Sequence, residues 1–366
     1  MSLNFRFAVV SDLHIAVPHT IWDNPSRFHL VEVSIPALEI VLKHLEQLDL
    51  DFLLLPGDLT QHGEPDNHAW LQGRLSQLPF PVYVVPGNHD VPSLHGTEIA
   101  IAFSDFPRFY HKFGYDNQAQ IYYTCQVLPG VRLIGLNSNQ FDEEGKQVGR
   151  LDDTQIEWLK QVLAASSDEL VLVMIHHNVV EHLPGQSRHS LGRRYMLENA
   201  AELLSILRSA KVQLVFTGHL HVQDVAYNQG IYDITTGSLV GYPHPYRILH
   251  YRTDELGRRS LQIETHRIES VPDWPTLPQI SRKWMGDRSH PFMLRLLTEP
   301  PLSLPHTTAE ELAPNLRYFW ADISGGDAMF DFSHFPPKAR RFFESFSAIS
   351  SNGTPAFIDN NTTLLL

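Results

Sequence analysis

Short apolar runs that stop abruptly at turn or polar residues constrain the fold of this chain more than any other feature. Each run is rich in β-branched or aliphatic residues, as expected for a strand that is buried on both faces. The runs occupy residues 5–10, 52–55, 82–85, 131–136, 170–175 and 214–216. Segments with the spacing of amphipathic helices lie between them, at 35–48, 152–165 and 196–207. Strands that alternate with helices predict an α/β fold.

The pattern changes after about residue 231, where β-rich segments follow one another without intervening helices. They predict a second sheet or the antiparallel edge of a mixed one. Three prolines interrupt residues 271–278, which is typical of a linker. Residues 336–350 predict a helix that begins at Pro337, and the polar residues 351–363 are expected to be loosely held.

The expected organisation is a domain at 1–267, a proline-rich linker at 268–278 and a C-terminal accessory segment at 279–366. That segment is expected to act as a lid, a dimer arm or a packing element.

Composition narrows the class of protein. The 366 residues are 43% hydrophobic and 19% charged, which is enough apolar material for a large core. The net charge of -13 disfavours a nucleic acid as the main partner. The single cysteine, Cys125, excludes an intrachain disulfide, and no stretch approaches the roughly 18 apolar residues of a membrane-spanning helix. We expect a soluble, cytoplasmic protein that does not bind membranes, and a homodimer remains open.

Residues that can bind a metal ion follow five of the apolar runs. The sequences are SDLH, GD, GNHD, HH and GHLH, in chain order. They contribute Asp12, His14, Asp58, Asn88, His89, Asp90, His176, His177, His219 and His221. In open α/β sheets the carboxyl ends of the strands share one edge, where ligands bind. The five clusters are therefore expected to converge in space.

The residue types indicate which ions this edge could hold. Carboxylates, imidazoles and an amide oxygen, without a thiolate, suit Mn, Fe, Zn or Co. Seven of these ten residues as ligands would be too many for one ion and would fit two. A carboxylate at Asp58 could bridge two ions about 3.5–4 Å apart, the arrangement used for phosphoryl transfer. Water bound between the ions would have its pKa lowered toward about 7 and would provide a hydroxide to attack phosphorus.

Taken together, the motifs closely resemble those of the calcineurin-like metallophosphoesterases. The series D-x-H, G-D, G-N-H-D, H-H and G-H-x-H spans residues 12–221 in that order. Within that superfamily, GDLTQHGEPDNHAW and PVYVVPGNHD are most similar to the bacterial cyclic-nucleotide and glycerophosphodiester phosphodiesterases. The resemblance implies a four-layer αββα sandwich of two mixed sheets flanked by helices, with a dinuclear metal site. It fades after about residue 267.

The resemblance also implies roles for single residues. One ion would be bound by Asp12, His14 and His221, the other by Asn88, His176 and His219, with Asp58 bridging them. Asn88 and His89 would contact the substrate, and His89 would help the leaving oxygen depart. His177 would lie behind the ligands, while Asp90 would either orient His89 or cap the following segment. The family frequently has a proline where this chain has Asn178.

The expected function is that of a metal-dependent phosphohydrolase, and specifically a phosphodiesterase acting on a small phosphate ester. A phosphomonoesterase or protein phosphatase would use the same two ions, and a scaffold could retain the metal site without catalysis. Specificity is expected to lie in residues 91–125, which are aromatic and basic.

Other polar residues have ordinary structural explanations. Six of the histidines outside the motifs are expected at the surface or in loops: His62, His68, His95, His111, His182 and His189. Arg188, Arg193 and Arg194 could bind phosphate, although a solvated helix start explains them equally simply.

Overall fold

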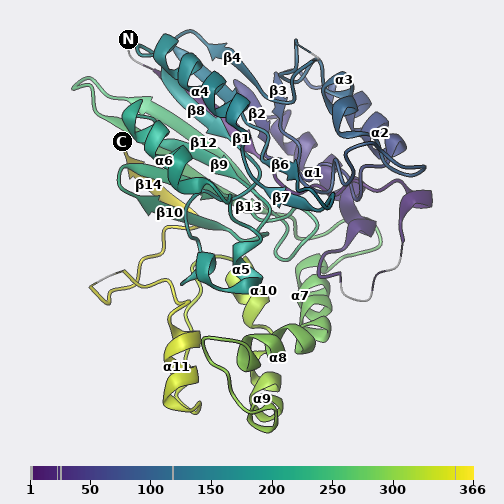
Figure 1. The fold of residues 1–366 in the computed structure, drawn as a ribbon, viewed down its shortest axis with the longest axis vertical. Coiled ribbons are helices and arrows are strands. Elements are labelled where there is room, and N and C mark those ends of the chain that lie inside the picture. Colours follow the sequence, from purple (N-terminus) through teal and green to yellow (C-terminus); the bar gives the residue numbers. More distant parts are fainter. Residues whose placement is uncertain (1–2, 23, 25–26, 118, 351) are drawn as a thin grey trace.

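The computed structural model describes residues 3–22, 24, 27–117, 119–350 and 352–366. Within them the chain forms two six-stranded sheets and a small hairpin (Figure 1). The first sheet has the order β14 (Asn361–Leu365), β13 (Arg259–Arg267), β12 (Pro245–Thr253), β1 (Asn4–Val9), β2 (Phe52–Leu55), β3 (Val82–Val84). The second has the order β10 (Asp224–Asn228), β11 (Ile231–Thr235), β9 (Leu214–Thr217), β8 (Leu170–Met174), β5 (Val131–Gly135), β4 (Tyr123–Leu128). The hairpin pairs β6 (Asn139–Phe141) with β7 (Gln147–Gly149).

Helices connect the parallel strands of both sheets. In the first sheet, α1 (Ser34–Leu45) joins β1 to β2, and α2 (Pro65–Leu75) joins β2 to β3. In the second, α4 (Asp153–Ala165) lies between β5 and β8, and α6 (Ala200–Ser209) joins β8 to β9. Asp152 accepts a hydrogen bond from the Gln155 backbone N–H at 2.7 Å, as expected for the cap of α4. Two four-residue helices, α3 (Phe106–Phe109) and α5 (Ser190–Arg193), interrupt the loops, and short 3-10 helices occur at Pro18–Thr20, Val31–Val33, Phe103–Asp105, Gln186–Arg188 and Ala313–Leu316.

The two sheets pack face to face, with helices on their outer faces. Strand β8 shows the arrangement, because its side chains alternate between two apolar clusters. Leu172 and Met174 join a core shared with strands of the first sheet, whereas Val171 and Val173 pack with α4 and α6. The αββα sandwich of two mixed sheets is therefore confirmed.

The end of the chain returns to the first sheet. Strand β14 pairs antiparallel with β13, with Leu364 opposite Leu261, and Leu364 is buried in the main core. The expectation that residues 351–363 are loosely held is thus wrong for residues 361–363. Thr362 and Thr363 suit a strand, and the adjacent leucines supply the apolar contact that the polar composition concealed.

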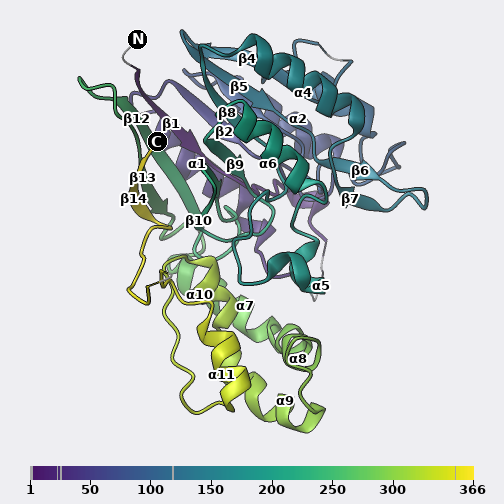
Figure 2. The same cartoon turned by 60° about the vertical axis from the view of Figure 1, so that its left-hand side comes forward.

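The remaining C-terminal residues form a helical group beside the sandwich (Figure 2). Its helices are α7 (Leu277–Arg288), α8 (His290–Thr298), α9 (His306–Leu312), α10 (Phe319–Ser324) and α11 (Pro337–Glu344). Helices α8 to α11 share an apolar cluster of their own, which also includes Leu191, Leu220 and Val222 of the sandwich, whereas Leu277 of α7 belongs to the main core. Helix α7 begins inside the expected linker, and the proposed boundaries at 267 and 279 remain predictions. No helix in the described part of the chain combines the length and apolar character that crossing a bilayer requires.

Candidate metal centre

The five polar clusters meet at one edge of the sandwich. Strands β1, β2 and β3 run parallel in one sheet, and β8 and β9 run parallel in the other. Two hydrogen bonds connect the sheets at this edge: His176 Nδ1 donates to the Pro56 carbonyl at 2.9 Å, and the His219 N–H donates to Asp12 Oδ1 at 3.1 Å. The expected convergence of the strand ends is what the structure shows.

Asp12, His14 and His221 form the first group of candidate ligands. His14 Nε2 lies 3.2 Å from His221 Nε2, and His221 Nε2 lies 3.1 Å from Asp12 Oδ1. Asp58 Oδ2 lies 3.8 Å from His14 Nε2. One potential ligand atom from each of these four residues lies within 4.8 Å of the others, so the group could hold a metal ion.

Asp58 also belongs to a second group, with His176 and His219. Its other oxygen, Oδ1, lies 3.4 Å from His176 Nε2. His176 Nε2 lies 3.1 Å from both His219 Nδ1 and the Asn88 amide oxygen. The carboxylate therefore directs one oxygen toward each group.

The hydrogen-bond pattern of the second group calls for a cation. His176 donates from Nδ1 to a carbonyl, so its neutral ring presents a lone pair at Nε2. His219 donates from Nε2 to the Arg194 carbonyl at 3.3 Å, which leaves a lone pair at Nδ1. Two lone pairs thus face each other beside the oxygens of Asn88 and Asp58. A cation at their centre would satisfy all four atoms, so the donor set fits a metal ion.

The pKa shifts of Asp58, His14 and His219 agree with this interpretation, and that of His176 describes the site before an ion binds. Burial opposes protonation of His176, but the Asp58 and Asp12 carboxylates outweigh it and raise its pKa to about 9. Burial and neighbouring histidines hold the pKa of His14 and of His219 well below the usual value. Burial disfavours an ionised Asp58, yet His176 and His89 hold its pKa well below the usual range. Asp58 is therefore ionised and His14 and His219 are neutral, as metal ligands require, whereas His176 carries a proton that a bound ion would displace.

The backbone at this edge is strained. Five candidate ligands have positive φ angles: Asp12 (51°), His14 (43°), Asp58 (49°), His219 (67°) and His221 (58°). Non-glycine residues rarely adopt this region, and such strain clusters at functional sites. Close packing requires glycine at two motif positions. A Cβ on Gly87 would clash with Asp58, and one on Gly218 would clash with Ser11 and Asp12.

His89 lies beside the two groups without completing either. Its Nδ1 donates to the Gln61 carbonyl at 2.7 Å, which leaves Nε2 as the ring atom free to exchange a proton. Its ring centroid lies 4.8 Å from that of His14, and the His89 N–H donates to Asp58 Oδ1 at 2.8 Å. His89 is thus held next to the candidate bridging carboxylate.

The other two motif residues support the loops. Asp90 does not orient His89: its carboxylate accepts hydrogen bonds from the N–H groups of Gly87, Leu59 and Thr60. Burial and the nearby Asp58 raise the pKa of Asp90 to about 7. His177 pairs through Nδ1 with Ser138 Oγ at 2.8 Å, and burial lowers its pKa to about 3.

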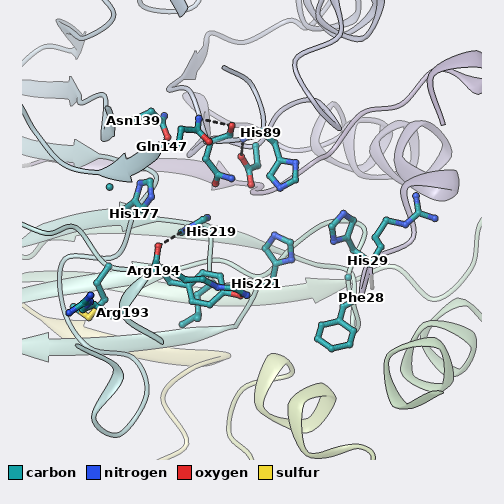
Figure 3. Close-up of a pocket in the computed structure, with 18 of the residues that line it drawn as sticks. Phe28, His29, His89, Asn139, Gln147, His177, Arg193, Arg194, His219 and His221 are labelled. Atoms are coloured by element: carbon teal, nitrogen blue, oxygen red, sulfur yellow. Dashed lines mark hydrogen bonds between the residues drawn. The ribbon is translucent and has the colours of Figure 1, made fainter. Parts of the chain in front are cut away.

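A cavity of about 640 Å³ opens over the two groups (Figure 3). The N-terminal loop lines it with Trp22, Arg27 and His29, and the C-terminal helices contribute Met285 and Trp320.

Comparison with known proteins shows the family to which the chain belongs. The model of the family described as Calcineurin-like phosphoesterase matches residues 5–223, more than half of the chain. The chain belongs to the calcineurin-like phosphoesterase family. It is a phosphoric ester hydrolase, as the sequence predicted.

Individual relatives refine this picture. The chain is 30% identical to a "Probable cyclic nucleotide phosphodiesterase" of Synechococcus sp., over 72% of this chain and 89% of that protein. It is 28% identical to a "Probable glycerophosphodiester phosphodiesterase" of Arcobacter nitrofigilis, over 58% of this chain and 70% of that protein. Its fold is similar to a dimetal phosphatase from Danio rerio, with a TM-score of 0.56 and 18% identity, over 72% of this chain and 96% of the other.

His29 lies at the same edge of the sandwich as the candidate ligands, although no sequence motif indicated it. Its ring stacks on that of His14 at 4.4 Å and lies 5.5 Å from that of His221. His14, His29 and His221 together form a third group that could hold an ion. Because His29 follows no apolar strand, only its residue type could have signalled it.

Several expectations about the surroundings were wrong. The described residues of 91–125 do not line the cavity; Phe106 and Tyr110 are buried in the core instead. His68 is buried in helix α2 rather than at the surface or in a loop, whereas His182 does lie in a loop but is buried there. Arg193 and Arg194, by contrast, do line the cavity.

Proposed function

We propose that the chain is a metal-dependent phosphodiesterase with a dinuclear metal centre. The observation that supports this most is the position of Asp58, whose two carboxylate oxygens face two separate groups of ligand atoms. A carboxylate shared in this way is the usual bridge of a two-metal phosphoesterase.

Asp12, His14 and His221 would hold one ion, and Asn88, His176 and His219 would hold the other. Mixed imidazole and oxygen ligands favour Mn, Fe, Zn or Co. His29 stands beside the first group and offers it a further imidazole. Two bound metal ions would supply a hydroxide at neutral pH and would neutralise charge on the phosphoryl oxygens.

His89 would supply the proton. With Nδ1 fixed on the Gln61 carbonyl, the ring can present a protonated Nε2 to the leaving oxygen. Arg193 and Arg194 add positive charge to the same cavity, where a phosphate ester carries negative charge. The residues of this edge thus orient the ester and protonate the departing alcohol.

The preference for diesters rests on the names of the relatives, which are cyclic-nucleotide and glycerophosphodiester phosphodiesterases. A small phosphate ester is the substrate class that this supports. The cytoplasmic location and the homodimer remain predictions of the sequence.

The test compares an aryl methyl phosphodiester with the matching aryl phosphomonoester, after loading with Mn, Fe, Zn or Co in turn. We expect faster hydrolysis of the diester, and the reverse order would support a phosphomonoesterase. Asp58→Ala should lower kcat/KM by at least about 10³-fold and reduce the bound metal below two ions per chain. A variant that kept both ions and the full rate would refute the dinuclear mechanism.

A further inference from the structure

A second cavity, of about 450 Å³, lies beside the first and is predominantly apolar. Aromatic side chains of α8, α10, α11 and the turn after α11 line it: Phe292, Trp320, Phe342 and Phe346. All four are only partly buried, although they pack against the apolar cluster of the C-terminal helices. Exposed aromatic surface of this kind is characteristic of binding sites, and the volume is that of a small-molecule pocket.

The two cavities are neighbours that share walls. Tyr195 and Trp320 line both. The Tyr195 ring centroid also lies 5.0 Å from that of His219, a candidate metal ligand. Tyr195 therefore contacts the candidate metal centre and also lines the apolar cavity.

One residue that lines the apolar cavity, His189, has a ring nitrogen without a partner among the described residues. His189 Nδ1 accepts a hydrogen bond from the Leu191 N–H at 3.1 Å, so the neutral ring carries its hydrogen on Nε2. This Nε2 is buried and has no hydrogen-bond partner in the described part of the chain. An unmet buried donor is costly, and a ligand oxygen would satisfy it.

From these features we propose that the substrate is an amphiphilic phosphodiester. Its phosphate would lie at the strand-end groups, and a single hydrocarbon chain on one of its alcohols would pass Tyr195 and Trp320 into the apolar cavity. An ester or amide carbonyl near the start of that chain would accept from His189 Nε2. This inference rests on the proposed phosphodiesterase function and adds the class of alcohol.

The test is a series of aryl phosphodiesters in which the second alcohol is methyl, butyl or octyl. All are used as monomers, below the concentrations at which they aggregate. Burial of one methylene contributes a factor of about four, so we expect kcat/KM to rise at least about 100-fold from methyl to octyl. Hydrolysis that is independent of chain length would overturn this inference and leave the proposed function intact. Failure to hydrolyse any member with any of the four metals would refute both.

A matched pair of variants locates the effect. Ser345→Trp places a ring in the apolar cavity and should lower the octyl-to-methyl ratio of kcat/KM at least about tenfold. Arg341→Trp adds the same ring at an exposed position of α11, four residues before Ser345, and should leave the ratio unchanged. Equal ratios in the two variants would contradict the assignment of the cavity. The wild-type series decides the matter if Ser345→Trp does not fold.

His189 has its own test. A diester whose second alcohol is a 2-acyloxyethanol should have a KM several-fold lower in the wild type than the 2-alkoxyethanol diester of equal chain length. In His189→Phe that gain should disappear while the dependence on chain length remains. An acyl preference that survives His189→Phe would remove the carbonyl from the proposed substrate.

Discussion

The strand-end side of the cavity carries ligand-type side chains on strained backbone, whereas the side formed by the C-terminal helices carries aromatic groups on regular helices. Five of the candidate ligands have φ between 43° and 67°. Trp320 and Met285 lie in ordinary helical turns of α10 and α7. Strained residues persist only where the surrounding structure over-determines them, as two hydrogen-bonded sheets do here. The first side is therefore suited to fixed chemistry, and the second to adaptable contact with the rest of the substrate.

Metal removal should have the largest effect of the changes considered, and it should act on the strand-end side of the cavity. Chelation should abolish hydrolysis, a loss of at least about 10³-fold, because the convergent lone pairs and the carboxylate then hold no ion. Ions at a thousand-fold excess over Kd should stabilise the fold by about 4 kcal/mol. Activity, metal content and Tm before and after chelation measure both effects. Full activity in metal-free protein would contradict the proposed chemistry, and restoration by added ions is the control.

His89→Ala should separate proton transfer from the other functions of the strained side. We expect kcat/KM to fall about 10²–10³-fold on esters with alkyl leaving groups, because His89 Nε2 no longer protonates the departing oxygen. For nitrophenyl esters kcat/KM should fall much less, because nitrophenolate departs without being protonated. The control is His62→Ala, since the His62 ring centroid lies 6.0 Å from that of His89. An equal loss on both kinds of ester would argue against leaving-group protonation.

The sequence revealed the strained side because its signals are local. Each apolar run ended where a strand ends, and the first residue of the tandem pair, His176, is the one that faces Asn88 and Asp58. His177 points to Ser138 instead. Periodicity determines where strands stop, and the topology of parallel strands then brings their ends together.

The adaptable side could not be predicted in the same way, because its contacts join distant segments without a shared pattern. His29 lies in a loop with no strand before it, and Trp320 belongs to a helix far along the chain. Strand β14 was missed because its polar threonines resemble a tail until Leu364 meets the core. In each case long-range packing, rather than local propensity, decides the structure.

His182 lies beside carboxylates of β10 and β11 and should matter for stability. It precedes the loop that lines the apolar cavity, and its ring lies 2.6 Å from Asp224 Oδ2 and 3.3 Å from Asp233 Oδ2. Burial lowers its pKa, but these carboxylates outweigh burial and raise the pKa to about 10. His182→Leu should lower the free energy of unfolding by about 3 kcal/mol, because it leaves a buried carboxylate without its cation.

The sign of the pH effect follows from the raised pKa of His182. Its contribution should be complete below pH about 6.5, the ordinary value, and should decline as the pH rises toward about 10. Tm measured across this range should fall more steeply in the wild type than in His182→Leu. His95→Leu, at an exposed histidine, should keep the wild-type slope. Parallel slopes in the wild type and His182→Leu would show that His182 is not charged in the folded state.

Arg194 stands at the boundary of the two sides and should give the smallest effect. Its guanidinium lies 4.6 Å from the centroid of the Tyr195 ring, and it lines the cavity from an exposed position. Because solvent screens an exposed charge, Arg194→Ala should raise KM only about two- to fivefold and leave kcat nearly unchanged. The difference should shrink as salt is raised, whereas Arg194→Lys should retain most of the affinity. A loss of kcat that persists at high salt would instead place Arg194 with the fixed chemistry of the strand ends.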